Sequence, residues 1–197
     1  VNDRIDAQEA DGNVPGIVPT SWHWDSNWAG PMWDAAIFIT PHLLYQYSGD
    51  TRAIETIYPA AKRYLEYLQT REEANGTINH GLGDWLFYKA QTPVDFMATC
   101  FYYWDNVLMA QMARLTGREP EAAPYEAKAE KLKVLINELF FDPEKVCYSN
   151  GTQLSYALPL YVGIVPEQYE KRLAENQNCC IADNDYSLDF GFIGSLV

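Results

Sequence analysis

The feature that most constrains the fold is a helical repeat of apolar residues that continues over most of the chain. In the segment 50–70, apolar side chains recur at intervals of three and four residues, which places them on one face of a helix. These residues are Ile54, Ile57, Tyr58, Ala61, Leu65 and Leu68. Gly49 is suited to end the preceding helix, and Asp50 can cap this one. The alternation typical of strands is missing, apart from short stretches inside loops.

A second long helix is predicted to begin at Thr92 and to end at Gly117. Thr92 is the expected N-cap, Pro93 the expected first helical residue, and Asp95 places a negative charge in the first turn. The apolar face of this helix consists of Met97, Cys100, Phe101, Trp104, Leu108, Met112 and Leu115. A partner helix follows, with apolar residues from Tyr125 to Leu139, and it stops before Pro143.

Shorter helices are predicted over 1–8, 153–162 and 167–175. Gly/Pro/Asn-rich loops separate the helices at 12–31, 75–92 and 142–152. This order predicts an all-α fold in which successive elements pair as helical hairpins. Such hairpins can form a bundle or a closed ring.

The composition indicates a folded domain without affinity for nucleic acid. The chain has 197 residues, of which 48% are hydrophobic, so it can bury a core. Lys and Arg number 14 and Asp and Glu 27, and the formal charge of -13 repels phosphate backbones and anionic membrane surfaces. No apolar run approaches the roughly 18 residues of a transmembrane helix. Neither nucleic acid nor a membrane is an expected partner.

Cysteine and histidine spacing does not suggest a metal site. The cysteines are Cys100, Cys147, Cys179 and Cys180, and the histidines are His23, His42 and His80. No C-x-x-C pair occurs and the histidines are scattered, so neither a metal nor a cofactor is predicted. Buried free thiols are the simplest interpretation of the cysteines, although their spacing leaves the disulfide state and the cellular compartment open.

Tryptophan is concentrated around the first long loop. Four of the six tryptophans fall within twelve residues, at Trp22, Trp24, Trp28 and Trp33. Loops carry binding residues disproportionately, and indole faces stack on the apolar C–H faces of sugars. A wall of indoles facing a sugar is therefore one interpretation. The alternative is a loop that is packed by its own rings.

A second candidate for binding is the turn Gly83-Asp84-Trp85, which precedes the helix predicted from Thr92. Such a turn can present an indole and a carboxylate together, although an Asp in a turn often hydrogen-bonds its own backbone. Sugar recognition requires ring faces together with a few polar groups for the hydroxyls. The candidate substrate-binding residues are Trp28, Trp33, Asp34, Asp84 and Trp85.

The order of these motifs resembles that in the α-L-rhamnosidases of glycoside hydrolase family 78. The matching segments are Asp11–Pro15, Trp33–Ala36, Tyr47–Asp50 and Gly83–Trp85. The resemblance implies an (α/α)6 barrel, a bacterial-type enzyme, and hydrolysis of terminal α-L-rhamnose with inversion. It also implies that the indoles of Trp33 and Trp85 line the rhamnose pocket, with Asp34 and Asp84 beside them.

The chain departs from the family pattern at the catalytic groups. An inverting glycosidase needs a carboxylic acid and a carboxylate roughly 6.5–9.5 Å apart. In the rhamnosidases the acid lies in a stretch that precedes the part matched by Val1, and the base follows the part matched by Val197. We therefore expect residues 1–197 to form part of the catalytic domain, truncated at both ends, and to work with the remaining domains of a parent chain.

Two other functions stay open on the sequence alone. The chain can belong to another (α/α)6-barrel glycosidase, such as a relative of trehalase or glucoamylase. It can also be a non-catalytic helical scaffold or sugar-binding domain whose tryptophan loop packs internally.

Overall fold

The computed structural model of the chain describes residues 1–19 and 28–196. The α-helices are α1 (Asn2–Asp6), α2 (Pro31–Asp34), α3 (Ala36–Ser48), α4 (Arg52–Thr70), α5 (Val94–Leu115), α6 (Glu119–Phe140), α7 (Gln153–Val162) and α8 (Glu167–Ala182). The short strands β1 (Phe141–Asp142) and β2 (Cys147–Tyr148) pair antiparallel, and the 3-10 turn η1 (Gly194–Leu196) follows α8.

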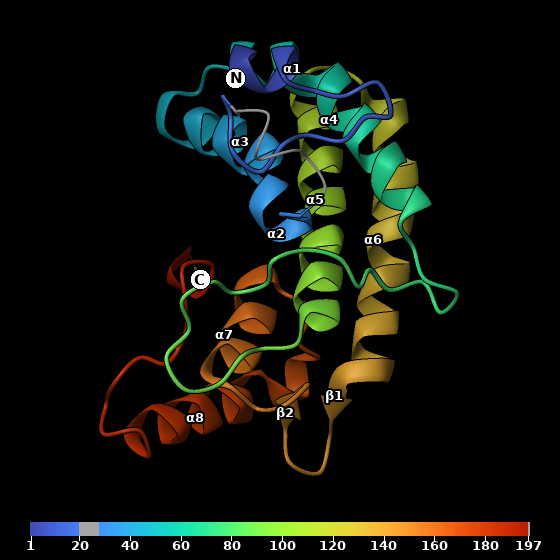
Figure 1. The fold of residues 1–197 in the computed structure, drawn as a ribbon. Coiled ribbons are helices and arrows are strands. Elements are labelled where there is room, and N and C mark those ends of the chain that lie inside the picture. Colours follow the sequence, from blue (N-terminus) through green and yellow to red (C-terminus); the bar gives the residue numbers. More distant parts are fainter. Residues whose placement is uncertain (20–27, 197) are drawn as a thin grey trace.

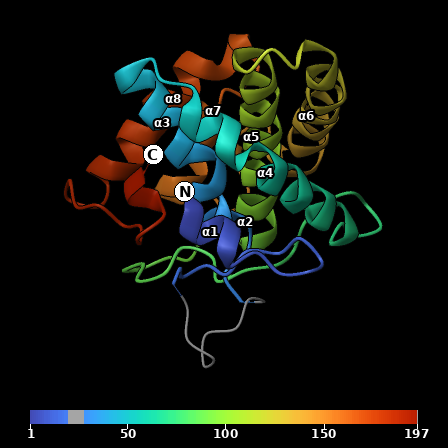
Figure 2. The ribbon, with the colours of Figure 1, turned by 90° about the horizontal axis from the view of Figure 1, so that it is seen from above.

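Successive helices pair as hairpins, as the sequence predicts. Helices α3 and α4, α5 and α6, and α7 and α8 pack against each other in the described residues. Figure 1 shows α5 and α6 side by side along most of their length. Helix α5 also contacts α2, α3, α4 and α7, and in the view from above it lies between α6 on one side and α2, α3 and α7 on the other (Figure 2). An all-α fold of helical hairpins is therefore present.

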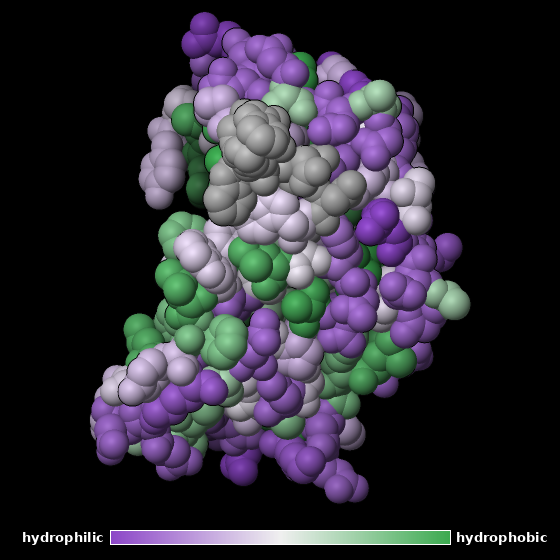
Figure 3. Space-filling view, viewed as in Figure 1, coloured by the Kyte–Doolittle hydropathy of each residue, from purple (hydrophilic) through white to green (hydrophobic). Residues whose placement is uncertain are grey.

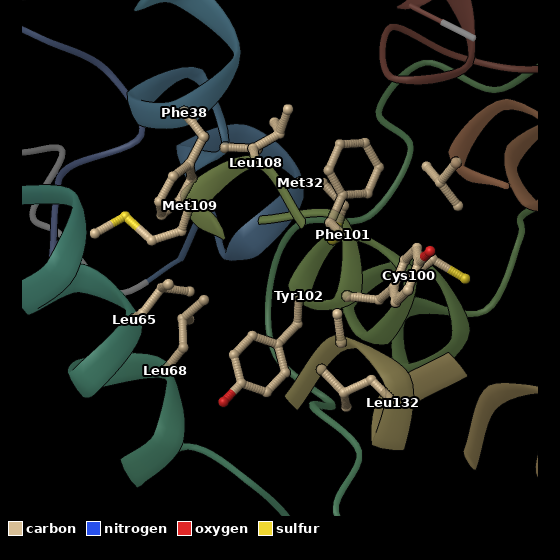
Figure 4. Packing of buried hydrophobic residues seen from close by; sticks show 14 of the residues in the cluster. Met32, Phe38, Leu65, Leu68, Cys100, Phe101, Tyr102, Leu108, Met109 and Leu132 are labelled. Atoms are coloured by element: carbon tan, nitrogen blue, oxygen red, sulfur yellow. The ribbon is translucent and has the colours of Figure 1, made fainter. Parts of the chain in front are cut away.

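The core forms where the apolar faces of these hairpins meet. All six residues of the predicted apolar face in segment 50–70 are buried on α4. Figure 4 shows Leu65 and Leu68 of α4 next to Tyr102 and Met109 of α5, with Leu132 of α6 on the other side of Tyr102. Helix α5 buries 15 of its 22 residues, which is typical of a helix at the centre of a domain. Its less buried residues Trp104, Val107, Gln111 and Arg114 lie along one face.

The predicted helix ends are correct at one boundary and wrong at two others. Gly49 ends α3 with a φ of 70°, as predicted. The prediction that Asp50 caps α4 is wrong, because Thr51 occupies the N-cap position, although the Asp50 carboxylate accepts the N–H of Arg52 at 2.9 Å. The prediction that Thr92 caps α5 is wrong. Pro93 occupies the N-cap position, and the Thr92 hydroxyl hydrogen-bonds the Thr152 hydroxyl at 2.7 Å instead. The Thr92 hydroxyl, which local geometry favoured as the cap of α5, thus bonds to the loop before α7.

The cysteines do not share one environment. All four are free; Cys100 and Cys147 are buried, as predicted for structural thiols. The same interpretation is wrong for Cys179, which is exposed, while Cys180 is half-buried. Both lie on α8, which extends to Ala182 rather than to the predicted residue 175 and buries few of its side chains.

Within the described residues, every helix is too short or too polar to cross a bilayer.

The central position of α5 predicts a large stability cost for truncating its buried side chains. We expect Phe101→Ala, at a site with 0% exposure, to lower the free energy of unfolding by about 3–5 kcal/mol because of lost transfer energy and a cavity. Val134→Ala on α6, where the side chain is 49% exposed, is the control and should change it by no more than about 0.5 kcal/mol. Urea titrations followed by circular dichroism compare the two. Equal midpoints would contradict the central role of α5.

Candidate functional site

Two loops cross closely at the start of α2. The N–H of Leu82 donates to the carbonyl of Ala29 at 3.1 Å. Gly30, with a φ of 74°, lies at the crossing, and a Cβ there would come within 2.6 Å of both the Gly81 Cα and the His80 carbonyl oxygen. Only a residue without a side chain fits. The crossing therefore brings α2 next to the Gly83-Asp84-Trp85 turn.

Trp33 is held in place from two sides. Its Nε1–H donates to the carbonyl oxygen of Gly83 at 3.0 Å. Its ring stacks on that of Phe192, with ring centroids 5.4 Å apart and an angle of 11° between the planes. The indole is half-buried. Its orientation is thus fixed by a loop that precedes α5 and by the segment that follows α8.

Asp84 lies inside the protein and bonds backbone groups. Its side chain is 1% exposed. One carboxylate oxygen accepts the N–H of Gly191 at 2.5 Å, and the other accepts those of Ile193 at 2.9 Å and Gly194 at 3.1 Å. Contact between this carboxylate and a sugar hydroxyl stays a prediction, and here its hydrogen bonds hold the C-terminal segment.

Trp85 is the more open of the two predicted pocket indoles. Its side chain is 52% exposed, and its carbonyl oxygen accepts the N–H of Phe192 at 2.8 Å. Leu86 and Phe87, which follow, are also exposed, as is Leu196. Figure 3 shows apolar side chains gathering on the face where this loop meets the C-terminal segment. Residues 33, 85 and 192 therefore belong to three segments that lie together.

The remaining predicted tryptophans are only partly described. Trp28 is half-buried beside the loop crossing. Trp22 and Trp24 lie outside the described residues.

Phe192 is not among the residues predicted from the sequence, although one signal was available: it is an aromatic residue in the run Gly191-Phe192-Ile193-Gly194.

Asp34 belongs to a buried polar cluster rather than to an open surface. It is 1% exposed, and one of its oxygens accepts the Tyr64 hydroxyl at 3.1 Å. Burial raises the pKa of Asp34 to about 8, against the opposing effects of the Tyr64 hydrogen bond and the Arg4 charge. Asp105 has no exposed surface, and both of its side-chain oxygens lack a hydrogen-bond partner among the described residues. Burial, together with the neighbouring Asp34, raises the pKa of Asp105 as well.

Other features of the described residues do not add chemistry to this site. They contain no group of three or more His, Cys, Asp or Glu side chains arranged to hold a metal. A cavity of about 170 Å³ is lined by Val1, Arg4, Ile37 and Ile57 among others, but not by Trp33, Trp85 or Phe192.

Comparison with known proteins gives a family match over the whole chain. The model of the bacterial alpha-L-rhamnosidase six-hairpin glycosidase domain matches residues 1–197. Among curated proteins, the alpha-L-rhamnosidase of Streptomyces avermitilis is 29% identical over 194 residues, which cover 98% of this chain and 18% of that protein. The alpha-L-rhamnosidase of Alteromonas sp. (strain LOR) is 28% identical over 208 residues, which cover 99% of this chain and 22% of that protein.

Solved structures give the same result. The structure of the Streptomyces avermitilis alpha-L-rhamnosidase complexed with L-rhamnose matches with a TM-score of 0.90 and 28% identity, over 98% of this chain and 18% of that one. The alpha-L-rhamnosidase from Dictyoglumus thermophilum matches with a TM-score of 0.87 and 27% identity, over 98% of this chain and 23% of that one. The chain thus spans about a fifth of the length of the curated relatives. The resemblance drawn from the motifs is confirmed, and so is the predicted fold class.

The buried cluster predicts a specific pH dependence of stability. Since the pKa of Asp34 is about 8 when folded and near 3.8 when unfolded, folding favours its protonated form. Its contribution is therefore complete below about pH 4 and is lost as the pH rises through about 8. In Asp34→Asn, the amide oxygen can still accept the Tyr64 hydroxyl but the titration is removed. We expect a smaller loss of stability between pH 5 and pH 8 in this variant than in the wild type.

Chemical denaturation at both pH values measures this difference. Asp183→Asn, which removes an exposed carboxyl group, is the charge-matched control and should keep the wild-type pH dependence. Parallel curves for Asp34→Asn and the wild type would show that Asp34 does not titrate in this range.

Proposed function

The chain belongs to the bacterial alpha-L-rhamnosidase six-hairpin glycosidase domain family, and on this premise we propose that it forms the sugar-holding part of an inverting α-L-rhamnosidase barrel. The observation that carries the proposal is the link between the two indole-bearing motifs. The Nε1–H of Trp33 donates to Gly83, the residue that opens the turn bearing Asp84 and Trp85. Two motifs about fifty residues apart in sequence thus lie next to each other, as a shared pocket requires.

In this proposal the aromatic side chains make the direct contacts with the sugar. Trp33 and Trp85 offer ring faces to the C–H face of a terminal rhamnose, and Trp28 lies beside the same loop crossing. Asp34 and Asp84 were predicted as further sugar-binding residues. Both are buried, so a sugar hydroxyl would reach them only if the surrounding segments moved. For Asp84, the bonds to the segment 191–194 would also have to open.

The chain contributes binding rather than proton transfer in this scheme. Inversion requires an acid that protonates the leaving oxygen and a base that activates water on the opposite face of the sugar ring. We propose that both carboxyl groups come from parts of the parent protein outside residues 1–197, because no segment here matches the family stretches that carry them. The rhamnose bound in the Streptomyces avermitilis relative supports rhamnose as the sugar.

Activity of the full-length parent protein tests the proposed function. We expect it to hydrolyse 4-nitrophenyl α-L-rhamnoside, and we expect Trp85→Ala to lower kcat/KM by roughly tenfold, because the loss of one aromatic contact costs about 1.4 kcal/mol. Tyr47→Ala, which removes an aromatic ring with 90% exposure on α3, is the control and should retain activity. The proposal fails if the parent protein prefers another aryl glycoside, or if Trp85→Ala acts like the control.

The proposed location of the catalytic carboxyl groups outside residues 1–197 gives a second prediction. Purified residues 1–197 should release no 4-nitrophenol above the uncatalysed background, because the catalytic carboxyl groups are expected elsewhere. The full-length protein at equal concentration is the positive control. Turnover by residues 1–197 alone would place an acid and a base within this chain.

A further inference from the structure

Two successive residues in the loop before α5 hold four successive backbone N–H groups of the C-terminal segment. The Asp84 carboxylate accepts the N–H groups of Gly191, Ile193 and Gly194 at 2.5, 2.9 and 3.1 Å. The Trp85 carbonyl oxygen accepts the N–H of Phe192 at 2.8 Å. We name this arrangement, Asp84 and Trp85 with residues 191–194, the backbone clamp. It fixes the path of the segment.

The glycines of the clamp are required by close contacts. A Cβ on Gly191 would lie 2.1 Å from the Trp85 carbonyl oxygen and 2.8 Å from an Asp84 carboxylate oxygen. A Cβ on Gly194 would lie 2.5 Å from the Cβ of Phe190. Since the partner at Gly191 is backbone, a side chain there would break the clamp rather than move a flexible neighbour.

The clamp sets the directions of the two side chains between these glycines. Ile193 is 1% exposed and belongs to the core. Phe192 is 57% exposed, and its ring lies nearly parallel to that of Trp33. The segment therefore anchors itself through one apolar residue and presents the other at the surface, next to a predicted pocket indole.

A phenylalanine held open to solvent suggests a ligand. Burying an aromatic ring is favourable, so a ring that the backbone fixes at the surface gives up that gain unless something covers it. Phe192 adds an open ring face to the half-buried Trp33 and lies on the segment that is bonded to Trp85. Trp85, Leu86 and Leu196, on the same two segments, are also exposed apolar side chains.

We propose that Phe192 is a third aromatic residue that contacts the sugar, and that Asp84 is a positioning residue that holds it through the backbone clamp. This proposal rests on the proposed function, since the ligand is the same terminal sugar. Phe192 provides a face for its C–H groups. In this inference Asp84 acts on sugar binding by keeping residues 191–194 in place.

Steady-state kinetics of the full-length parent protein test the role of Phe192. With 4-nitrophenyl α-L-rhamnoside, Phe192→Ala should raise KM roughly three- to tenfold, the range of one aromatic contact, with a smaller change in kcat. Phe192→Tyr keeps the ring and should restore KM. Tyr186→Ala, which removes a ring with 80% exposure in the loop after α8, is the matched control and should leave KM unchanged.

A double-variant comparison tests the role of Asp84. Asp84→Asn places an amide N–H₂ against backbone N–H donors, and it should raise KM as Phe192→Ala does. The double variant should be no worse than Phe192→Ala alone, because both changes remove the same contact. Additive effects would show that Asp84 does not act through Phe192. If Asp84→Asn does not fold, Gly191→Ala, which breaks the clamp at the Trp85 carbonyl, takes its place in the same comparison.

The outcomes separate this inference from the proposed function. A wild-type parent protein without α-L-rhamnosidase activity overturns the proposed function. An active wild type with an unchanged KM in Phe192→Ala overturns only the inference. A lowered KM in Phe192→Ala also overturns the inference. In that case the Phe192 ring would block the access of the sugar to Trp33 instead of adding to the binding surface.

Discussion

The fold depends on helix α5, which buries most of its residues and contacts at least one helix of each hairpin. The polar residues that this burial places in the core need partners there. Thr99 shows how this is achieved, because its hydroxyl accepts the N–H of Ile78 from the loop before α5 at 3.1 Å. Asp105 has no such partner among the described residues, and burial together with the neighbouring Asp34 raises the pKa of its carboxyl group. The central helix thus organises polar groups as well as apolar ones.

The candidate site is a product of the same packing. The loop that leads into α5 is tied to it at Ile78, passes Gly30 at the crossing with the first long loop, and then presents Asp84 and Trp85. Backbone contacts therefore fix the positions of the residues that carry the indoles. They make the loop more rigid at the place where a ligand is proposed to bind. Rigid support of this kind is what aromatic recognition of a sugar needs.

The sequence predicted those features that depend on neighbours along the chain. The buried face of α4, the end of α3 at Gly49 and both ends of α7 follow from local periodicity and turn chemistry. The burial of Asp34 and the surface position of Phe192 did not follow. They result from hydrogen bonds and stacking with residues distant in sequence, which no local pattern encodes. The motifs with Trp33 and Trp85 lie in loops that meet in the structure, but the hydrogen bond between these loops could not be predicted from local sequence.

The hydrogen bonds of Asp84 have a consequence for the order of folding. They join residues 107 to 110 positions apart, so they close loops that span more than half of the 197-residue chain. Closing such a loop has a large entropic cost and becomes favourable only when the intervening helices have already docked. We therefore expect the surface formed by Trp33, Trp85 and Phe192 to be assembled late, after the hairpins. During synthesis on the ribosome, the helices can form while this surface is still incomplete.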